Sequence, residues 1–431
     1  MSRPGAFDLL AEPIQRVLWD MRWTELRPIQ TDAIHQILGG TNDLIIAAST
    51  ASGKTEAAFL PILSRIVEEP GHSVRAVYVG PLKALINDQF RRLEDLCNHA
   101  EIPVHRWHGD VSGSAKSKLI KSPSGVLLIT PESIESLFVN RSTQLINLFR
   151  DLEYVVIDEI HAFVGIERGT HLRSLLYRIE QFSDRALRLV GLSATLGDPR
   201  NTSAWYGPKR AENTQIIRDD SEKSIRYKIY AFKASKPVPD KEGQESGETQ
   251  GHQAEVERIF DHFRHNTNLI FANSKSIVEE TADKLNQINR HRGMAEQFLV
   301  HHGSLSKEIR EFTENEMRSA RPTTGVCSST LELGIDIGDV EAVGQIGPCW
   351  SVSSLVQRLG RSGRRDGKPS VMRVYIPVHV QPDDTDLVKQ LCPDLLRAVA
   401  LTELMLQKWV EPPTVHPYDL STLLQQILSV L

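Results

Sequence analysis

The chain has 431 residues, of which 40% are hydrophobic, so it can form two or three globular domains with buried cores. Its formal net charge of −5 excludes a polycation that binds nucleic acid over its whole surface, and any such site has to be a local groove. The four cysteines show no C-x-x-C spacing, and there is no apolar run of membrane-spanning length and no secretory signal; we therefore expect reduced thiols, no zinc and a cytoplasmic location.

Short apolar strands alternate with helical patterns, which is typical of parallel α/β sheets. In the first half the expected strands are Leu44–Ala48, Ala76–Val79, Val126–Thr130, Tyr154–Ile157 and Leu187–Leu192. In the second half they are Leu269–Ala272, Gln297–His301, Gly325–Ser328, Ala342–Ile346 and Val371–Ile376. A charged, Pro- and Gly-rich stretch at 235–253 predicts a mobile loop, and strand-like alternation over Ser224–Phe232 places the boundary between the halves near residue 220.

A phosphate-binding loop pattern, Ala48–Thr55, follows the first strand and has Ala48 where the pattern usually begins with Gly. Lys54 would reach the β- and γ-phosphates of a nucleotide, and the Thr55 hydroxyl would hold Mg²⁺. The next residues open a helix whose N-terminal dipole would face the phosphates. A glycine turn with a surface lysine is the alternative, but it does not explain the strand before the loop and the helix after it.

Two adjacent carboxylates follow the strand Tyr154–Ile157, within the sequence Asp158-Glu159-Ile160-His161. Ligands of open α/β sheets bind at the carboxyl edge of the strands. Asp158 would therefore hold Mg²⁺ beside Thr55, and Glu159 would orient or activate a water molecule. Taken alone, such a pair is more often a solvated surface feature; the upstream phosphate loop favours the functional interpretation.

Further polar motifs stand at strand ends or open helices along the chain. They are Leu26–Gln30, Pro81–Leu85, Thr130–Ser133, Ser193–Thr195, Phe271–Lys275, His301–Leu305, Ser328–Gly338 and Gln357–Arg365. Taken singly, most of them are ordinary turn or cap chemistry. His302 as a metal ligand is disfavoured because no second ligand stands at a fitting spacing.

As an ordered set over residues 20–385, the motifs resemble the superfamily 2 DExH/DEAH-box helicases, most closely the large helicase-related (Lhr-like) family. The resemblance implies an α/β fold of two tandem RecA-like lobes, each a parallel sheet flanked by helices, with ATP between them and single-stranded nucleic acid across their top. The expected domains are lobe 1 over 1–220, lobe 2 over 221–385, and a helical lead-in over 386–431 to a winged-helix domain.

By this resemblance, Gln30 reads the adenine, since its amide offers both a donor and an acceptor; a solvated helix-capping role is the alternative. The implied ATP-binding residues are Gln30, Ser52, Gly53, Lys54, Thr55 and Asp336. The implied coupling residues are His161, Ser193, Thr195 and Gln357. The implied nucleic-acid contacts are Pro81, Lys83, Thr130, Pro131, Ser274, His302, Gly303 and Thr330.

Three arginines, Arg358, Arg361 and Arg364, recur at i, i+3 and i+6, which predicts one helical face with mutual repulsion that calls for an anionic partner. Guanidinium groups suit a γ-phosphate. By resemblance, Arg361 and Arg364 are arginine fingers, and Gln357 pairs with His161. A basic nucleic-acid patch is the alternative.

The expected function is that of a monomeric helicase or translocase that uses ATP and Mg²⁺ and moves 3′-to-5′ on single-stranded DNA. An ATP-switched clamp, an RNA remodeller and a catalytically dead binding module stay open as alternatives. At the C-terminus, apolar residues from Leu420 to Leu431 follow helical spacing with Asp419 or Ser421 as N-cap. We expect a further domain after this helix, through which partner proteins could bind.

Overall fold

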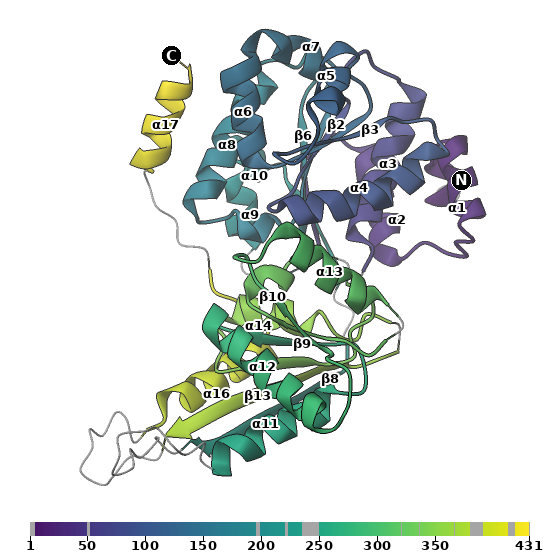
Figure 1. The fold of residues 1–431 in the computed structure, drawn as a ribbon. Coiled ribbons are helices and arrows are strands. Elements are labelled where there is room, and N and C mark those ends of the chain that lie inside the picture. The colour runs from purple at the N-terminus through teal and green to yellow at the C-terminus, as the bar shows by residue number, and fades with distance from the viewer. Residues whose placement is uncertain are drawn as a thin grey trace. The chain divides into compact units, whose positions relative to one another are not determined.

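The computed structural model describes residues 5–49, 52–194, 199–219, 223–234, 250–319, 321–335, 337–365, 367–379, 391–412 and 419–430. The chain groups into two compact units, unit 1 comprising Met1–Asp220 with Pro412–Leu431 and unit 2 comprising Ser221–Glu411. Each unit is a parallel sheet flanked by helices, so the expected α/β fold is confirmed (Figure 1).

Unit 1 contains a seven-stranded sheet in the order β3-β4-β2-β5-β6-β1-β7, parallel throughout. The strands are β1 (Leu44–Ala47), β2 (Ala76–Val79), β3 (Val104–Trp107), β4 (Val126–Ile129), β5 (Tyr154–Ile157), β6 (Arg188–Ser193) and β7 (Gln215–Arg218). Successive side chains enter different cores, Ile46 on one face and Ile45 on the other, because side chains alternate along a strand. Burial on both faces explains the continuous apolar runs of the central strands.

Helices cover both faces of this sheet (Figure 1). One core is shared with α1 (Glu12–Asp20), α2 (Pro28–Gly39), α3 (Lys54–Glu68) and α4 (Lys83–Asn98). The other is shared with α5 (Gly113–Lys121), α6 (Pro131–Arg141), α7 (Leu145–Phe149), α8 (Glu167–Glu180) and α9 (Pro199–Trp205). Shorter elements of unit 1 are α10 (Pro208–Ala211), η1 (Phe7–Leu9), η2 (Ser142–Gln144) and η3 (Ile160–Ala162).

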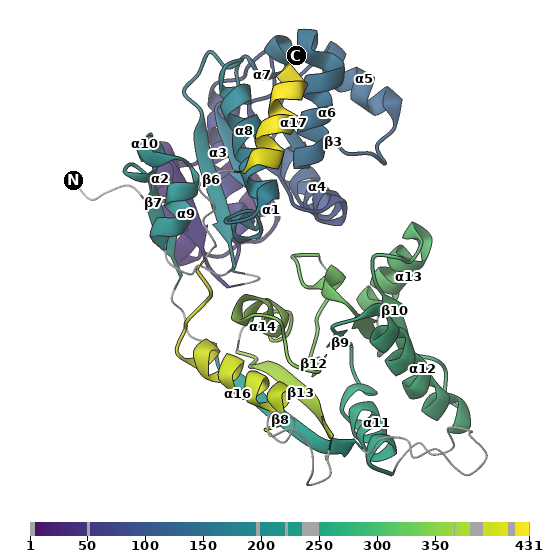
Figure 2. The same ribbon diagram turned by 90° about the vertical axis from the view of Figure 1, so that its left-hand side faces the viewer.

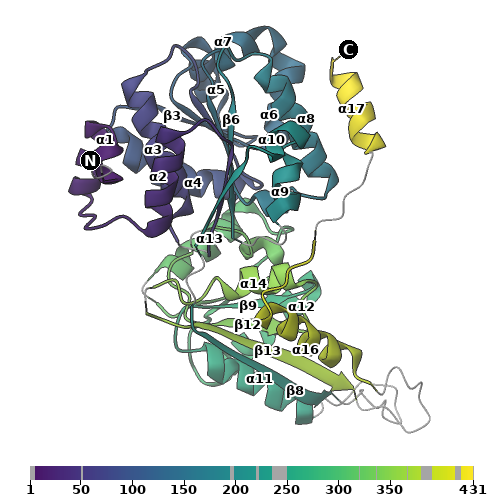
Figure 3. The same ribbon diagram turned by 180° about the vertical axis from the view of Figure 1, so that it is seen from behind.

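Unit 2 contains a six-stranded parallel sheet in the order β10-β11-β9-β12-β13-β8. The strands are β8 (Ile225–Ala234), β9 (Asn268–Ala272), β10 (Phe298–His301), β11 (Thr324–Cys327), β12 (Val343–Ile346) and β13 (Ser370–His379). One face packs on α11 (Gln250–Phe263) and α12 (Lys275–His291), and the other carries α14 (Val352–Leu359) and α16 (Pro393–Leu406) (Figures 2 and 3). The remaining elements are α13 (Lys307–Arg318) and η4 (Ser329–Leu331).

Every expected strand is present, with ends that differ by at most three residues. The sequence prediction missed β3 and β7, which lie at the two edges of the first sheet and bury few side chains. Residues 235–249 of the expected loop lie outside the described residues, and α11 begins at Gln250, so the last part of that stretch is helical. In the part of the chain that is described, no helix has both the length and the apolar character to cross a bilayer.

The prediction that three arginines lie on one helical face is wrong. Helix α14 ends at Leu359 with Gly360 as C-cap, so Arg361 and Arg364 lie beyond it. Gly363 has a positive φ of 66°, and a Cβ there would lie 2.7 Å from the Pro369 carbonyl oxygen. After the helix has ended, the chain therefore turns at Gly363 in a conformation that favours glycine.

The C-terminal helix α17 (Leu420–Val430) packs against α6 and α8 of unit 1 (Figure 2). Asp419 caps it, since its Oδ1 accepts a hydrogen bond of 3.1 Å from the Thr422 amide, as expected. The expected lead-in 386–431 is therefore not one segment: α16 belongs to unit 2 and α17 to unit 1. The buried side of α17 is polar, with Thr422 and Gln426, while its leucines are exposed.

Candidate functional site

The phosphate-loop pattern lies between β1 and α3, and Gly53 caps α3 with a φ of 83°. A Cβ at Gly53 would lie 2.5 Å from Gln30 Nε2, so the Gln30 amide packs directly on the loop. Gln30 also caps α2, since its Oε1 accepts a hydrogen bond of 2.9 Å from the Arg27 amide. The glutamine thus caps a helix, but it is 2% exposed rather than solvated, and it reaches the phosphate loop.

Lys54 turns back over the end of β1. Its Nζ donates to the carbonyl oxygens of Ala48 at 2.7 Å and Ser49 at 2.9 Å. Thr55 is the second residue of α3 and is buried, as is Ser52. The ammonium group, the two side-chain hydroxyls and the start of α3 therefore surround the same loop, an arrangement that suits phosphate oxygens.

The carboxylate of Asp158 is buried at the end of β5. Its Oδ1 accepts from the Glu159 amide at 3.0 Å, and its Oδ2 accepts a short hydrogen bond from the Tyr78 hydroxyl. Burial raises the pKa of Asp158 to about 6, and the charge of Glu159 adds to this, whereas the Tyr78 hydroxyl and the Lys54 ammonium act in the opposite direction.

Glu159 is held in an unusual backbone conformation, and its Oε2 lies 3.6 Å from His161 Nδ1, beyond hydrogen-bond distance. Its φ is 48°, in the left-handed region that non-glycine residues rarely adopt. Its buried Oε2 has no hydrogen-bond partner among the described residues, and neither has the buried Ser52 Oγ. Leaving such groups unpaired costs about 1–3 kcal/mol each, which indicates that this edge of the sheet takes a polar ligand.

The residues at this edge fit Mg²⁺ held together with a nucleotide. Mg²⁺ is typically bound through one or two carboxylates, several waters and substrate phosphates. Asp158 supplies a carboxylate, and Thr55 supplies a hydroxyl. Within the described ranges no group of three or more His, Cys, Asp or Glu residues could hold a metal ion.

A continuous hydrogen-bonded path joins the acidic motif to the phosphate loop. His161 Nδ1 lies 3.0 Å from Ser193 Oγ, and the Ser193 carbonyl accepts from the Ala48 amide at 3.1 Å. The path follows from the strand order, because β6 lies between β5 and β1. Ser193, one of the implied coupling residues, thus contacts the acidic motif through His161, whereas Thr195 lies outside the described residues.

A pocket of about 490 Å³ opens at the ends of β2, β3 and β4. It is lined by Pro81, Leu82, Lys83, Trp107, His108, Gly109, Lys116, Thr130, Glu132, Ser133, Ser136 and Arg168. Three predicted nucleic-acid contacts, Pro81, Lys83 and Thr130, are therefore brought together, and Pro131 follows as the first residue of α6. Sequence reasoning missed Trp107, His108, Lys116 and Arg168; recognition of β3 as a strand would have exposed the first two as strand-end residues.

The predicted contacts of unit 2 lie at the ends of β9, β10 and β11, which are neighbours in the sheet. Ser274 caps α12 by accepting from the Ile277 amide at 3.3 Å. His302 Nε2 lies 2.9 Å from Glu279 Oε1, and Gly303 follows it. The Thr330 hydroxyl donates to the carbonyl of His301 at 3.1 Å and lies 2.8 Å from its Nδ1.

The first two arginines of Gln357–Arg365 have partners inside unit 2. Arg358 is buried against the Glu332 carboxylate, with Nη2–Oε2 at 2.9 Å. Arg361 is 1% exposed and donates to the carbonyl oxygens of Glu332 at 2.7 Å and Ile335 at 3.1 Å. Repulsion within this motif therefore needs no external anion, contrary to the sequence argument.

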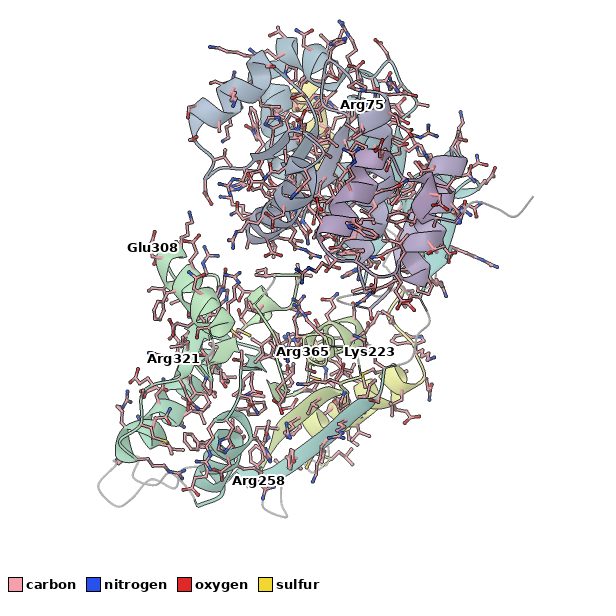
Figure 4. The ribbon with its side chains drawn as sticks, turned by 90° about the vertical axis from the view of Figure 1, so that its right-hand side faces the viewer. Arg75, Lys223, Arg258, Glu308, Arg321 and Arg365 are labelled. Carbon is pink, nitrogen blue, oxygen red and sulfur yellow. The ribbon has the colours of Figure 1, made fainter. Side chains whose placement is uncertain are left out.

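Other residues of this region add to its positive charge. Arg364 is half-buried, and Arg365 is exposed and pairs with Asp339 at 2.8 Å. Lys223 Nζ donates to the Gly363 carbonyl at 3.5 Å, and Figure 4 shows Lys223 and Arg365 on the same side of unit 2.

The two remaining predicted site residues of unit 2 are Gln357 and Asp336. Gln357 Nε2 donates to Ser353 Oγ at 3.4 Å. Asp336 lies outside the described residues.

Two protein families match the chain in sequence. The DEAD/DEAH box helicase family matches residues 27–202, and the helicase conserved C-terminal domain matches residues 251–366. The chain is 32% identical over 406 residues to the Lhr helicase/probable uracil glycosylase of Mycolicibacterium smegmatis, covering 84% of this chain and 26% of that protein. It is 30% identical over 382 residues to the ATP-dependent helicase Lhr-Core of Methanocaldococcus jannaschii, covering 83% and 42%.

Solved helicase structures are also similar to the chain. The structure of Mycobacterium smegmatis helicase Lhr bound to ssDNA and AMP-PNP matches with a TM-score of 0.82 and 29% identity, covering 99% of this chain and 54% of that one. The DUF1998 helicase MrfA bound to DNA and AMPPNP shares the fold, with a TM-score of 0.78 and 23% identity over 100% of this chain and 57% of that one. The chain thus spans less than half the length of the two curated relatives named above.

Proposed function

Because the chain belongs to the Lhr-like family of superfamily 2 DEAD/DEAH box helicases, we propose that it hydrolyses ATP with Mg²⁺ and moves along single-stranded DNA in the 3′-to-5′ direction. One observation carries this proposal. At a single sheet edge in unit 1, Lys54 and the buried acidic pair lie beside the ends of β2, β3 and β4. These strand ends line the pocket described above, which we call the lobe-1 pocket.

In unit 1, the nucleotide would be held by residues that already surround the phosphate loop. Lys54 exchanges its two carbonyl partners for the β- and γ-phosphates, and Gln30 pairs with the adenine while touching the loop at Gly53. Thr55 and Asp158 would hold Mg²⁺, which would supply positive charge to neutralise the phosphates. Glu159 Oε2 accepts a hydrogen bond from the attacking water, which gives the unpartnered oxygen its partner.

Unit 2 would supply Arg361 and Arg364 to the γ-phosphate when the two units close on the nucleotide, with Asp336 near the ribose. For this, Arg361 must release the carbonyls of Glu332 and Ile335, so its engagement depends on movement of that loop. Gln357 then pairs with His161, and the Ser193 contact carries the change to the phosphate loop. Arginine fingers contribute roughly 10³–10⁵ in rate in related phosphoryl-transfer systems.

Nucleic acid would be gripped through its phosphates and sugars by two sets of strand ends, one in each unit. The lobe-1 pocket in unit 1 offers the ammonium groups of Lys83 and Lys116, and unit 2 offers hydroxyl, amide and imidazole groups at Ser274, Gly303, His302 and Thr330. Such contacts carry no sequence information, so we expect sequence-independent binding. DNA is favoured over RNA because the structure with 29% identity is described as bound to ssDNA.

The deciding experiment is ATP hydrolysis measured without nucleic acid, with single-stranded DNA and with single-stranded RNA. We expect stimulation by DNA, and ATP-dependent displacement of a protein block ahead of the 3′-to-5′ moving chain; Lys54→Ala serves as the inactive control. Stimulation by RNA alone would favour the RNA remodeller, and affinity changes without displacement would favour the clamp. Absence of any stimulation would contradict the proposal. We also propose that the chain is cytoplasmic, since free thiols suit a reducing compartment, and that it is a monomer, which gel filtration with light scattering would test.

A further inference from the structure

Arg168 is the second residue of α8, the helix that follows the acidic motif. Its Nε donates to Glu132 Oε1 at 2.6 Å, and its Nη2 donates to Glu132 Oε2 at 3.1 Å. The same Nη2 donates to the Pro81 carbonyl at 2.7 Å. A fork-shaped pair with a carboxylate and a bond to a carbonyl fix the guanidinium in one orientation.

The two partners of Arg168 belong to different strand-end loops. Pro81 follows β2, and Glu132 lies in the first turn of α6, directly after Thr130 and Pro131 at the end of β4. Both loops line the lobe-1 pocket, as does Arg168 itself. Partial burial is the largest single effect and raises the pKa of the Glu132 carboxyl, but the hydrogen bonds from Arg168, from its own amide and from Thr130, together with the charge of Arg168, lower that pKa below its ordinary value. The bridge therefore stays charged at neutral pH.

On its other side, Arg168 contacts the segment that follows the acidic motif. The Arg168 guanidinium lies 5.4 Å from the centre of the Phe163 ring, which follows η3 and hence Asp158-Glu159. A Cβ on Gly169 would lie 1.6 Å from the Phe163 carbonyl oxygen, so the start of α8 touches the backbone of this segment. A displacement of Glu159 and η3 would therefore move α8 with them.

We propose that Arg168 is a positioning residue that couples nucleotide binding at the sheet edge of unit 1 to the binding of single-stranded nucleic acid in the lobe-1 pocket. This inference rests on the proposed function. It sets the spacing between the loop at Pro81 and the loop at Thr130, and a nucleotide-dependent shift of the acidic motif changes this spacing through α8. This connection lies entirely within unit 1 and is separate from the His161–Ser193 path to the phosphate loop.

If Arg168 and Glu132 only stabilised the fold, their variants would unfold more easily, but the exposure of the pair argues against a large effect on stability. The Glu132 side chain is 58% exposed and that of Arg168 is 32% exposed, and ion pairs at such exposure contribute little to stability, about 0–1 kcal/mol. Variants of either residue should therefore fold, which leaves their effect on coupling open to measurement.

The test uses the full chain and a fluorescent oligo-dT, with its dissociation constant measured with and without AMP-PNP and Mg²⁺. The ratio of the two constants is the coupling factor, for which we expect about 5–150 in the unchanged chain. Arg168→Ala and Glu132→Ala should each bring the ratio close to one, and the double variant should add little to either. Arg168→Lys, which keeps the charge but loses the fork, should recover only part of it. Arg173→Ala, an exposed arginine on the same helix, is the matched control and should keep the ratio.

If Arg168→Ala binds DNA more weakly but keeps the ratio of the two dissociation constants, the inference is overturned. Arg168 would then contact the DNA without coupling it to the nucleotide. An additive double variant would overturn it too, because the two residues would then act separately. If the unchanged chain binds no oligo-dT and its ATP hydrolysis is not stimulated, the proposed function fails first and the inference fails with it. Circular dichroism of each variant excludes unfolding as the cause.

Discussion

Glu159 combines a left-handed backbone with a buried oxygen that lacks a hydrogen-bond partner among the described residues. Glu159→Gln keeps the size of the side chain but removes its capacity to accept a proton. We expect ATP or AMP-PNP to bind within about twofold of the unchanged affinity while turnover falls roughly 10²–10⁴-fold. Equilibrium binding and steady-state phosphate release measure the two quantities. Normal turnover in this variant would remove Glu159 from the water-orienting role.

The pKa of Asp158, raised to about 6, predicts a pH dependence of Mg²⁺ binding. Below this pH the folded chain holds the carboxyl protonated, so the apparent Mg²⁺ affinity should fall about tenfold per pH unit. Because burial raises this pKa from 3.8, ionised Asp158 costs stability at neutral pH, and the cost disappears as the pH falls towards 4. Tyr78→Phe removes a hydrogen bond that lowers the pKa, and should move the acidic limb to higher pH. A limb that moves to lower pH would contradict this account.

Arg358 and Arg361 are three residues apart, and their variants should separate folding from catalysis. Arg358→Ala leaves the buried Glu332 carboxylate without a counter-charge, and breaking a buried ion pair in this way typically costs about 3–5 kcal/mol of stability. Arg361→Ala removes the hydrogen bonds to the carbonyls of Glu332 and Ile335 and should still bind ATP, with turnover lowered by roughly 10³-fold or more. Urea unfolding and single-turnover hydrolysis measure the two effects. Arg364→Ala should lose turnover with little loss of stability, and unchanged turnover would exclude it as a finger.

These residues also show where sequence reasoning stops. Lys54, Thr55 and the acidic pair were predictable because strand, loop and helix follow one another in a fixed local pattern. The pairing of Arg358 with Glu332 was not, since 26 residues separate them and only the fold brings them together. Arg168 lacks a local motif as well, because its partners Pro81 and Glu132 are 87 and 36 residues away.

Among the elements, burial decided which strands the sequence could reveal. The central strands β1, β2, β4 and β5 are buried at every position and read as short apolar runs. The edge strands β3 and β7 bury only one side chain each, Trp107 and Ile217, so they carry no such run. The sequence prediction extended helix α14 too far, because the arginines recur at helical spacing. The helix nevertheless ends at Leu359, with Gly360 as its C-cap.

Helix α17 binds unit 1 through its polar side. Gln426 Nε2 donates to Glu135 at 2.6 Å, and Gln426 Oε1 accepts from Ser174 and Arg178 at 3.0 Å each. Gln426→Leu should lower the opening free energy of the helix by about 1–3 kcal/mol, because it removes three hydrogen bonds to partly buried groups, two of which are charged. Leu424→Ser should change it by less than about 0.5 kcal/mol, because Leu424 is 61% exposed. Hydrogen exchange of the α17 amides measures both; the opposite ranking would show that the apolar side anchors the helix.

For the molecule as a whole, the proposed mechanism requires that unit 1 and unit 2 move relative to each other during the ATP cycle. Dyes at Lys121→Cys in unit 1 and Arg321→Cys in unit 2, with Cys392→Ser to remove the more exposed thiol, would report this by energy transfer. We expect the transfer efficiency to change when AMP-PNP and single-stranded DNA are added together, and to change less in Arg361→Ala. A constant efficiency would contradict closure as the step that delivers the fingers.

The contact between Gly169 and the Phe163 carbonyl also constrains how this sequence can evolve. Even one methyl group at position 169 would have to occupy space filled by backbone, which cannot rotate aside as a side chain can. We therefore expect selection to reject every substitution of Gly169, although this position lies outside the phosphate loop and the acidic motif. In a library of single substitutions, tolerance should drop sharply at 169 and recover at the exposed Arg173, one helical turn along α8.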